Sequence, residues 1–213
     1  MKNFLTTLTL VFTMMISAQT PYENAMTTKI MLVEKEQSTE SLTSLANDFR
    51  RIADKEKTQW LPYYYAAFST IQKGRLMMRQ GKMSELDAVA NEAQKHLDLA
   101  INLQAEQAEN FILQKMIHGL RMMVNPQDRY MTEGPLAEKA LQKAKTLDPL
   151  NPRLTLMQAE DTYFTPEQFG GNKAKGLELF QKALDQYAEH KSPSPLHPYW
   201  GKPQAEYFLK HKP

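Results

Sequence analysis

The chain has 213 residues, a formal net charge of +2 and no cysteine. The lack of cysteine excludes disulfides, thiolate nucleophiles and thiolate metal sites. A nearly neutral chain also gives no electrostatic reason to expect binding to nucleic acid or to an anionic membrane surface. The residues after position 18 are numerous enough to form one domain with its own hydrophobic core.

The first 18 residues have the pattern of a secretory signal peptide. Lys2 provides the positive charge, an uncharged stretch runs from Phe4 to Ile16, and the small residues Ser17 and Ala18 follow. The uncharged stretch is shorter than the roughly 20 residues that a membrane-spanning helix needs. We therefore expect cleavage after Ala18, no membrane span in the mature chain, and a periplasmic or secreted protein.

The rest of the sequence predicts helices and no strands. Good helix formers dominate, and no segment alternates apolar and polar residues as a half-buried strand does. Proline, glycine and polar breaks divide the chain into eight expected helices in four pairs: about 22–35, 39–54, 62–80, 84–100, 106–124, 135–147, 153–164 and 173–189.

Three local signals in this series lead to specific expectations. Gly81 is expected to end the third helix in the left-handed conformation. A loop through Tyr130 to Gly134 is expected before Pro135, which would begin the sixth helix. The apolar residues of the C-terminal tail, among them Tyr199 and Trp200, are expected to fold back over the last hairpin.

A short phrase recurs along the chain at helical spacing. It consists of a small or apolar residue, a bulky apolar residue four positions later, and usually an alanine three positions after that. The copies are Ala137, Leu141 and Ala144; Ala93, Leu97 and Ala100; Gly176, Phe180 and Ala183; and the weaker Leu45, Phe49 and Ile52. Such repetition predicts stacked helical hairpins, in which each repeat buries its apolar face against its neighbours.

The clearest copy, followed by Pro149, resembles the second helix of a tetratricopeptide repeat. The run from Phe169 to Ala174 and the phrase from Trp60 to Ala66 resemble segments of small exported bacterial members of that superfamily. The resemblance implies an all-α, right-handed solenoid of about four hairpins that binds proteins or peptides in a concave groove. The expected organisation is a signal peptide (1–18), a repeat domain (19–190) and a C-terminal capping tail (191–213).

No group of residues in the sequence has the spacing of a catalytic or metal site. The five histidines are not placed three or four apart on any helix, and no serine lies in a nucleophile elbow. We therefore predict no catalytic residue, no metal site, no cofactor and no enzymatic activity.

The leading functional prediction is an exported, non-catalytic module with a protein or peptide partner. Its groove would be lined by the first helix of each pair. Tyr65 is expected to point away from the core, and the other lining candidates are Gln72, Gln114, His118 and Arg121. The alternative is a small-solute binding or uptake accessory subunit with an apolar pocket between helices, walled by the fifth helix. An enzyme is a third possibility.

Overall fold

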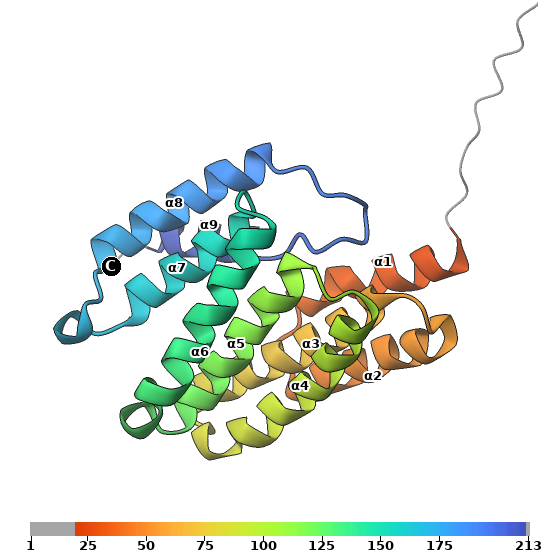
Figure 1. The fold of residues 1–213 in the computed structure, drawn as a ribbon, viewed down its shortest axis with the longest axis horizontal. Helices are drawn as coiled ribbons and strands as arrows, with labels where there is room; N and C mark the ends of the chain where they lie inside the picture. The colour runs from red at the N-terminus through yellow and green to blue at the C-terminus, as the bar shows by residue number, and fades with distance from the viewer. Residues whose placement is uncertain (1–19, 212–213) are drawn as a thin grey trace, which may run out of the picture.

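The computed structural model describes residues 20–211, and within them the protein is helical, with no strand (Figure 1). The predicted signal peptide lies outside the described residues. Two short 3-10 turns, Met83–Glu85 and Glu167–Phe169, accompany the α-helices. These helices are α1 (Pro21–Val33), α2 (Thr39–Glu56), α3 (Trp60–Arg79), α4 (Leu86–Leu103), α5 (Ala108–Val124), α6 (Pro126–Leu147), α7 (Pro152–Phe164), α8 (Lys173–Glu189) and α9 (Lys202–Lys210).

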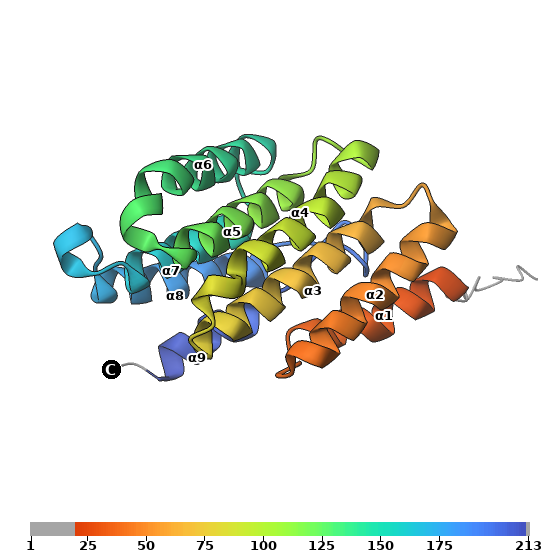
Figure 2. The same ribbon diagram turned by 90° about the horizontal axis from the view of Figure 1, so that it is seen from below.

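Helices that follow one another in the chain pack side by side. The closest neighbours are α2 with α3, α3 with α4, α5 with α6, and α7 with α8. Figure 2 shows α1 to α6 following one another across the molecule. This arrangement confirms the prediction of an all-α array of helical hairpins. None of the helices within residues 20–211 is long and apolar enough to cross a membrane.

The third helix ends as its sequence predicts. Gly81 has a φ of +77°, in the left-handed region that residues with a side chain rarely adopt. The N–H of Gly81 donates to the carbonyl of Met78, and the N–H of Lys82 donates to the carbonyl of Met77. These two bonds form a Schellman motif, which satisfies carbonyls that the helix end would otherwise leave free.

The sixth helix begins earlier than expected, because Pro126 and not Pro135 occupies its first turn. The expected loop from Tyr130 to Gly134 is helical. Pro135 lies inside the helix, where its ring removes one N–H donor and crowds the preceding turn. Figure 2 shows the resulting bend between the first turns of α6 and the rest of the helix. Proline occurs both in the first turn of helices and at kinks inside them. Pro135 was expected to begin a helix, but it lies at a kink inside one.

The core follows the apolar stripes of the helices. On α2 the buried residues recur at the helical period and form one stripe, made of Leu42, Leu45, Ala46, Phe49 and Ala53. α5 is buried around most of its circumference and includes the buried polar residues Glu109 and Asn110. One continuous cluster of buried apolar residues joins the N-terminal helices to the last hairpin.

The segment between α8 and α9 leaves the last hairpin and packs against α3. Trp200 stacks on Phe68 of α3 with ring centroids 4.6 Å apart, and its Nε1 donates to the Tyr64 hydroxyl at 2.7 Å. The next residue, Gly201, has a φ of +100° and donates its N–H to Glu34 at 2.8 Å. We call residues 196–201 the strap, because they tie the last hairpin to α3 and to the chain after α1.

Candidate functional site

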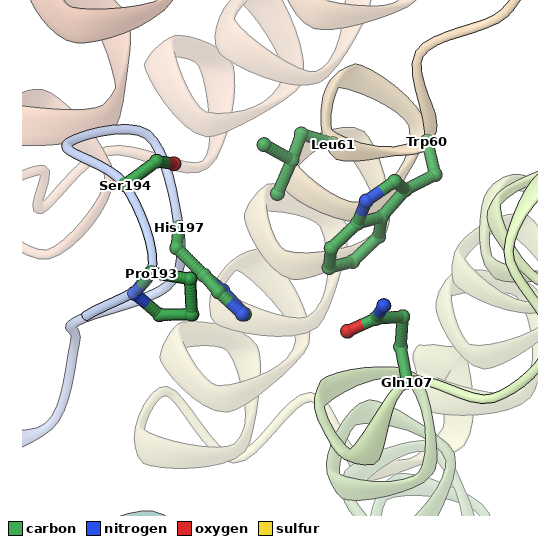
Figure 3. Close-up of a pocket in the computed structure, with 6 residues that line it drawn as sticks. All are labelled: Trp60, Leu61, Gln107, Pro193, Ser194 and His197. Carbon is green, nitrogen blue, oxygen red and sulfur yellow. The ribbon is translucent and has the colours of Figure 1, made fainter. Parts of the chain in front are cut away.

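A pocket opens where the chain that leads into the strap passes the N-terminal ends of α3 and α5 (Figure 3). Its cavity has a volume of about 220 Å³. Three separate parts of the chain contribute its lining residues, which are Trp60, Leu61, Gln107, Pro193, Ser194 and His197. The walls are therefore partly aromatic and apolar, with an amide, a hydroxyl and an imidazole among them.

Helix ends present two of these side chains. Trp60 is the first residue of α3, and Gln107 is the residue that precedes α5. Gln107 has extended backbone and its side chain makes no capping hydrogen bond, so its amide faces the pocket (Figure 3). The site thus takes its fixed wall from two helices whose positions the core determines.

His197 approaches the pocket from the opposite wall. The Tyr65 hydroxyl donates to the carbonyl of Leu196 at 3.0 Å, and the N–H of His197 donates to the carbonyl of Ser194 at 3.1 Å. The imidazole meets the Trp60 ring edge-on, with centroids 5.9 Å apart and an interplanar angle of 90°. These contacts hold the ring so that it extends across the pocket toward Gln107 (Figure 3).

The imidazole of His197 is neutral at pH 7. Its Nδ1 is buried and has no hydrogen-bond partner among the described residues. Burial disfavours the charged form and lowers the pKa of His197 from 6.5.

A buried charged network lies beneath the strap. The Arg153 guanidinium donates from Nε to both oxygens of Glu109, at 3.1 and 2.9 Å, and from Nη2 to Oε1. Asn151 donates to the same carboxylate at 2.6 Å, and the Tyr64 hydroxyl does so at 3.3 Å. Burial alone would lower the pKa of Arg153, but the adjacent Glu109 charge raises it, so the guanidinium stays protonated.

A second cavity, of about 300 Å³, lies between α1 and α2. The Tyr22 hydroxyl is buried there without a hydrogen-bond partner in the described part of the chain, and burial raises its pKa to about 12. The polar lining carries both signs of charge, and Lys29 forms an ion pair with Asp48. This mixed lining does not favour a ligand of either charge.

Tyr65 is buried, although the sequence predicted that it would point away from the core. Its side chain is 1% exposed and donates to the strap, so the expectation that it would be accessible is wrong. The strap covers the face of α3 on which Tyr65 lies. Helical periodicity cannot show this cover, because Leu196 is 131 residues away in the chain.

Three other predicted residues come together on α5. His118 contacts Glu133 of α6 at 2.7 Å and Gln114 at 3.1 Å, while Gln114 and Gln94 of α4 exchange hydrogen bonds at 2.8 and 2.9 Å. Arg121 donates to Gln94 at 3.4 Å. These side chains join α5 to α4 and α6 and lie outside the pocket, and the half-buried Gln72 of α3 takes no part in their network.

Sequence reasoning missed the residues that form the pocket. Trp60 lies just before the expected third helix, and His197 lies in a proline-rich segment with no periodicity. No sequence signal joins these two residues to Gln107, since only the path of the strap brings them together. Among residues 20–211 there is also no cluster of three or more histidine, aspartate or glutamate side chains that could hold a metal ion.

These features define a class of protein, an all-α array of helical hairpins with a small pocket beside its C-terminal strap. No protein-family profile matches the chain, and no curated protein sequence does. The solved structure of the HusA haemophore from Porphyromonas gingivalis is similar to it, with a TM-score of 0.76 and 33% sequence identity. The match covers 89% of this chain and 92% of that one, so the chain belongs to the family of the HusA haemophore.

This kinship corrects the leading functional prediction. A relationship to a haemophore contradicts the predicted protein-interaction module with a protein or peptide partner, and it favours the small-solute alternative. The repeat phrase predicted the architecture correctly but carries no information on the ligand. The comparison does not name the tetratricopeptide superfamily, so that resemblance stays a prediction.

Proposed function

We propose that this protein binds haem and carries it outside the cytoplasm. The observation that carries the proposal is the 33% identity to the HusA haemophore over 92% of that chain. A haemophore is a carrier and not a catalyst, which agrees with the prediction of a non-catalytic protein. The predicted signal peptide supports a role outside the cytoplasm.

The pocket chemistry is compatible with this ligand. Haem is a flat apolar macrocycle with a metal at its centre, and proteins hold it with apolar walls and an axial side chain such as histidine. The pocket provides the indole of Trp60, the side chain of Leu61 and the imidazole of His197. Its cavity of about 220 Å³ is below the roughly 300–1,000 Å³ of pockets that enclose a small molecule. The pocket would therefore hold part of the haem and leave the rest in solvent, a mode that favours release to an acceptor.

Titration of the chain from Gln19 onward with haemin tests the proposal. We expect a saturable change in the Soret band and quenching of tryptophan fluorescence at the same stoichiometry. The chain has two tryptophans, Trp60 in the pocket and Trp200 in the core. A Trp60→Phe variant therefore reports on Trp200 alone, and we expect weaker quenching in this variant because its remaining indole lies outside the pocket.

The same chain in urea is the control for non-specific adsorption of haemin. If the native protein gives no saturable Soret change, or gives the same change as the unfolded chain, the proposed function is wrong. Transfer of bound haem to apomyoglobin, followed by absorbance, then tests whether the protein releases its ligand as a carrier must.

A further inference from the structure

We propose that residues 191–195, which we call the gate, swing outward to open the pocket beside Trp60 when the ligand enters. The gate leads from the end of α8 to the strap and supplies Pro193 and Ser194 to one wall of the pocket. This inference rests on the proposed function, because it describes how the edge of a haem would enter a pocket that is too small for it while the gate is closed.

The two walls of the pocket differ in how firmly they are held. Trp60 and Leu61 belong to α3, and Gln107 immediately precedes α5, which packs against α3. The core therefore fixes this wall. The cavity of about 220 Å³ is below the roughly 300–1,000 Å³ of pockets that enclose a small molecule. Additional space has to come from movement of the opposite wall, to which the gate belongs.

The gate is not bonded to the helices that it passes. Within residues 20–211, residues 191–195 form no hydrogen bond or ion pair with any helix. Their bonds are local, since the Ser194 carbonyl accepts from the Ser192 hydroxyl at 2.8 Å and from the N–H of His197 at 3.1 Å. Pro193, Ser194 and Pro195 are exposed. Opening of the gate therefore breaks no bond to the helices and uncovers little apolar surface, so its free-energy cost is low.

Both ends of the gate are held while its middle is free. One end continues from the last turn of α8, and at the other the Tyr65 hydroxyl donates to the carbonyl of Leu196 at 3.0 Å. Between them, Pro193 and Pro195 have a fixed φ, and a residue that precedes a proline is restricted to extended backbone. The gate therefore moves as a stiff flap about its two ends, and the buried part of the strap stays in place.

The absence of cysteine allows the gate to be tested with a cleavable tether. Gln107→Cys and Ser194→Cys place thiols on opposite walls of the pocket, and a short bismaleimide with a disulfide in its spacer joins them (Figure 3). Reduction followed by capping with iodoacetamide cuts the tether and leaves no free thiol that could bind iron. The tethered form is thus compared with the cut form of the same variant.

A second tether outside the pocket is the matched control. Glu106 and Lys143 are exposed and form an ion pair at 3.1 Å, so the same reagent can join Glu106→Cys to Lys143→Cys without crossing the pocket. Circular dichroism checks the helix content of every form before titration with haemin. Leu61→Cys with Ser194→Cys spans the same pocket and repeats the test if the first pair disturbs the fold.

We expect the tether across the pocket to weaken haemin binding about tenfold or more, because it holds the gate closed. Cutting this tether should restore the binding. The control tether should change neither the affinity nor the Soret spectrum.

The outcomes separate the two proposals. If the wild-type chain binds haemin and the tethered and cut forms bind it equally well, the gate is wrong while haem binding stands. The gate also fails if the control tether causes the same loss, since the loss would then not depend on the pocket. If the wild-type chain does not bind haemin at all, the proposed function itself fails.

Discussion

At the scale of single residues, the buried pair of Arg153 and Glu109 places two opposite charges inside the core. The side chains are 1% and 2% exposed, so both charges have left water. Their mutual hydrogen bonds, with those from Asn151 and Tyr64, compensate for the lost hydration. The Arg153 guanidinium also lies 5.6 Å from the centre of the Trp200 ring, which links the pair to the strap.

Neutralising one member of this pair should destabilise the protein strongly. Glu109→Gln leaves the Arg153 charge buried without its counter-ion, and such losses cost about 3–5 kcal/mol. The matched control is Glu106→Gln, which breaks an ion pair to Lys143 between exposed side chains and should cost at most about 1 kcal/mol. Urea unfolding followed by circular dichroism measures both, and equal losses in the two variants would contradict this view of the pair.

Two histidines should make the stability of the protein depend on pH. Burial lowers the pKa values of His96 and His197 below 6.5, so below that pH the unfolded chain binds more protons than the folded one. Stability from this source is therefore complete above pH 6.5 and is lost as the pH falls through that value. We expect the melting temperature to decrease between pH 7 and 5.5, and to decrease less in a double variant with His96→Gln and His197→Gln. An identical pH dependence in the two proteins would exclude the histidines as its cause.

At the scale of elements, two left-handed glycines serve different purposes. Gly81 ends α3 in open space, since a Cβ added there meets nothing within 4 Å. Gly201 joins the strap to α9, and a Cβ added there lies 2.3 Å from Leu156 and 2.5 Å from the Tyr187 hydroxyl. Position 81 requires only a residue that can adopt the left-handed conformation. Position 201 requires this conformation and also leaves no room for a side chain.

Substitution of each glycine by alanine should separate these two requirements. Gly81→Ala should cost about 1–2 kcal/mol for the left-handed backbone alone. Gly201→Ala bears the same cost and must also displace Leu156 or Tyr187, so we expect a larger loss of stability and a change in the fluorescence of Trp200. Urea unfolding provides the comparison, and a Gly201→Ala variant as stable as Gly81→Ala would show that the strap tolerates a side chain there.

At the scale of the whole molecule, the last hairpin is joined to the rest mainly through side chains. The backbones of α6 and α7 approach each other closely at few positions. Contact across this boundary comes from the Arg153 and Glu109 pair, from ion pairs such as Lys115 with Asp161 at 2.6 Å, and from Trp200 on Phe68. The strap therefore couples two parts that would otherwise be more independent.

Removal of Trp200 should uncouple these parts. In Trp200→Ala we expect amide hydrogen exchange to accelerate more in α7 to α9 than in α2 to α4, because the hairpin loses its anchor on α3. Tyr199→Ala is the control, since the Tyr199 hydroxyl donates to the carbonyl of Tyr187 in α8. Uniform acceleration along the Trp200→Ala chain would instead indicate one cooperative unit.

The sequence predicts what depends on neighbours in the chain and misses what depends on distant ones. The array of helical hairpins and the end of α3 at Gly81 follow from local spacing and backbone preference, and the structure confirms both. The burial of Tyr65 and the meeting of Trp60, Gln107 and His197 depend on the path of the strap. Even the start of α6 required knowledge of how the chain bends at Pro135.

The strap also sets the order in which the protein can finish folding. Tyr64 and Trp200 are hydrogen-bonded across 136 positions of the chain, so the aromatic face of α3 stays uncovered until residues 196–201 have been made. Contacts this distant form late, after the entropy of closing the loop has been overcome. A chain threaded through a membrane from its N-terminus would keep its core open throughout its passage. It could complete that core only on the far side, after residues 196–201 had crossed.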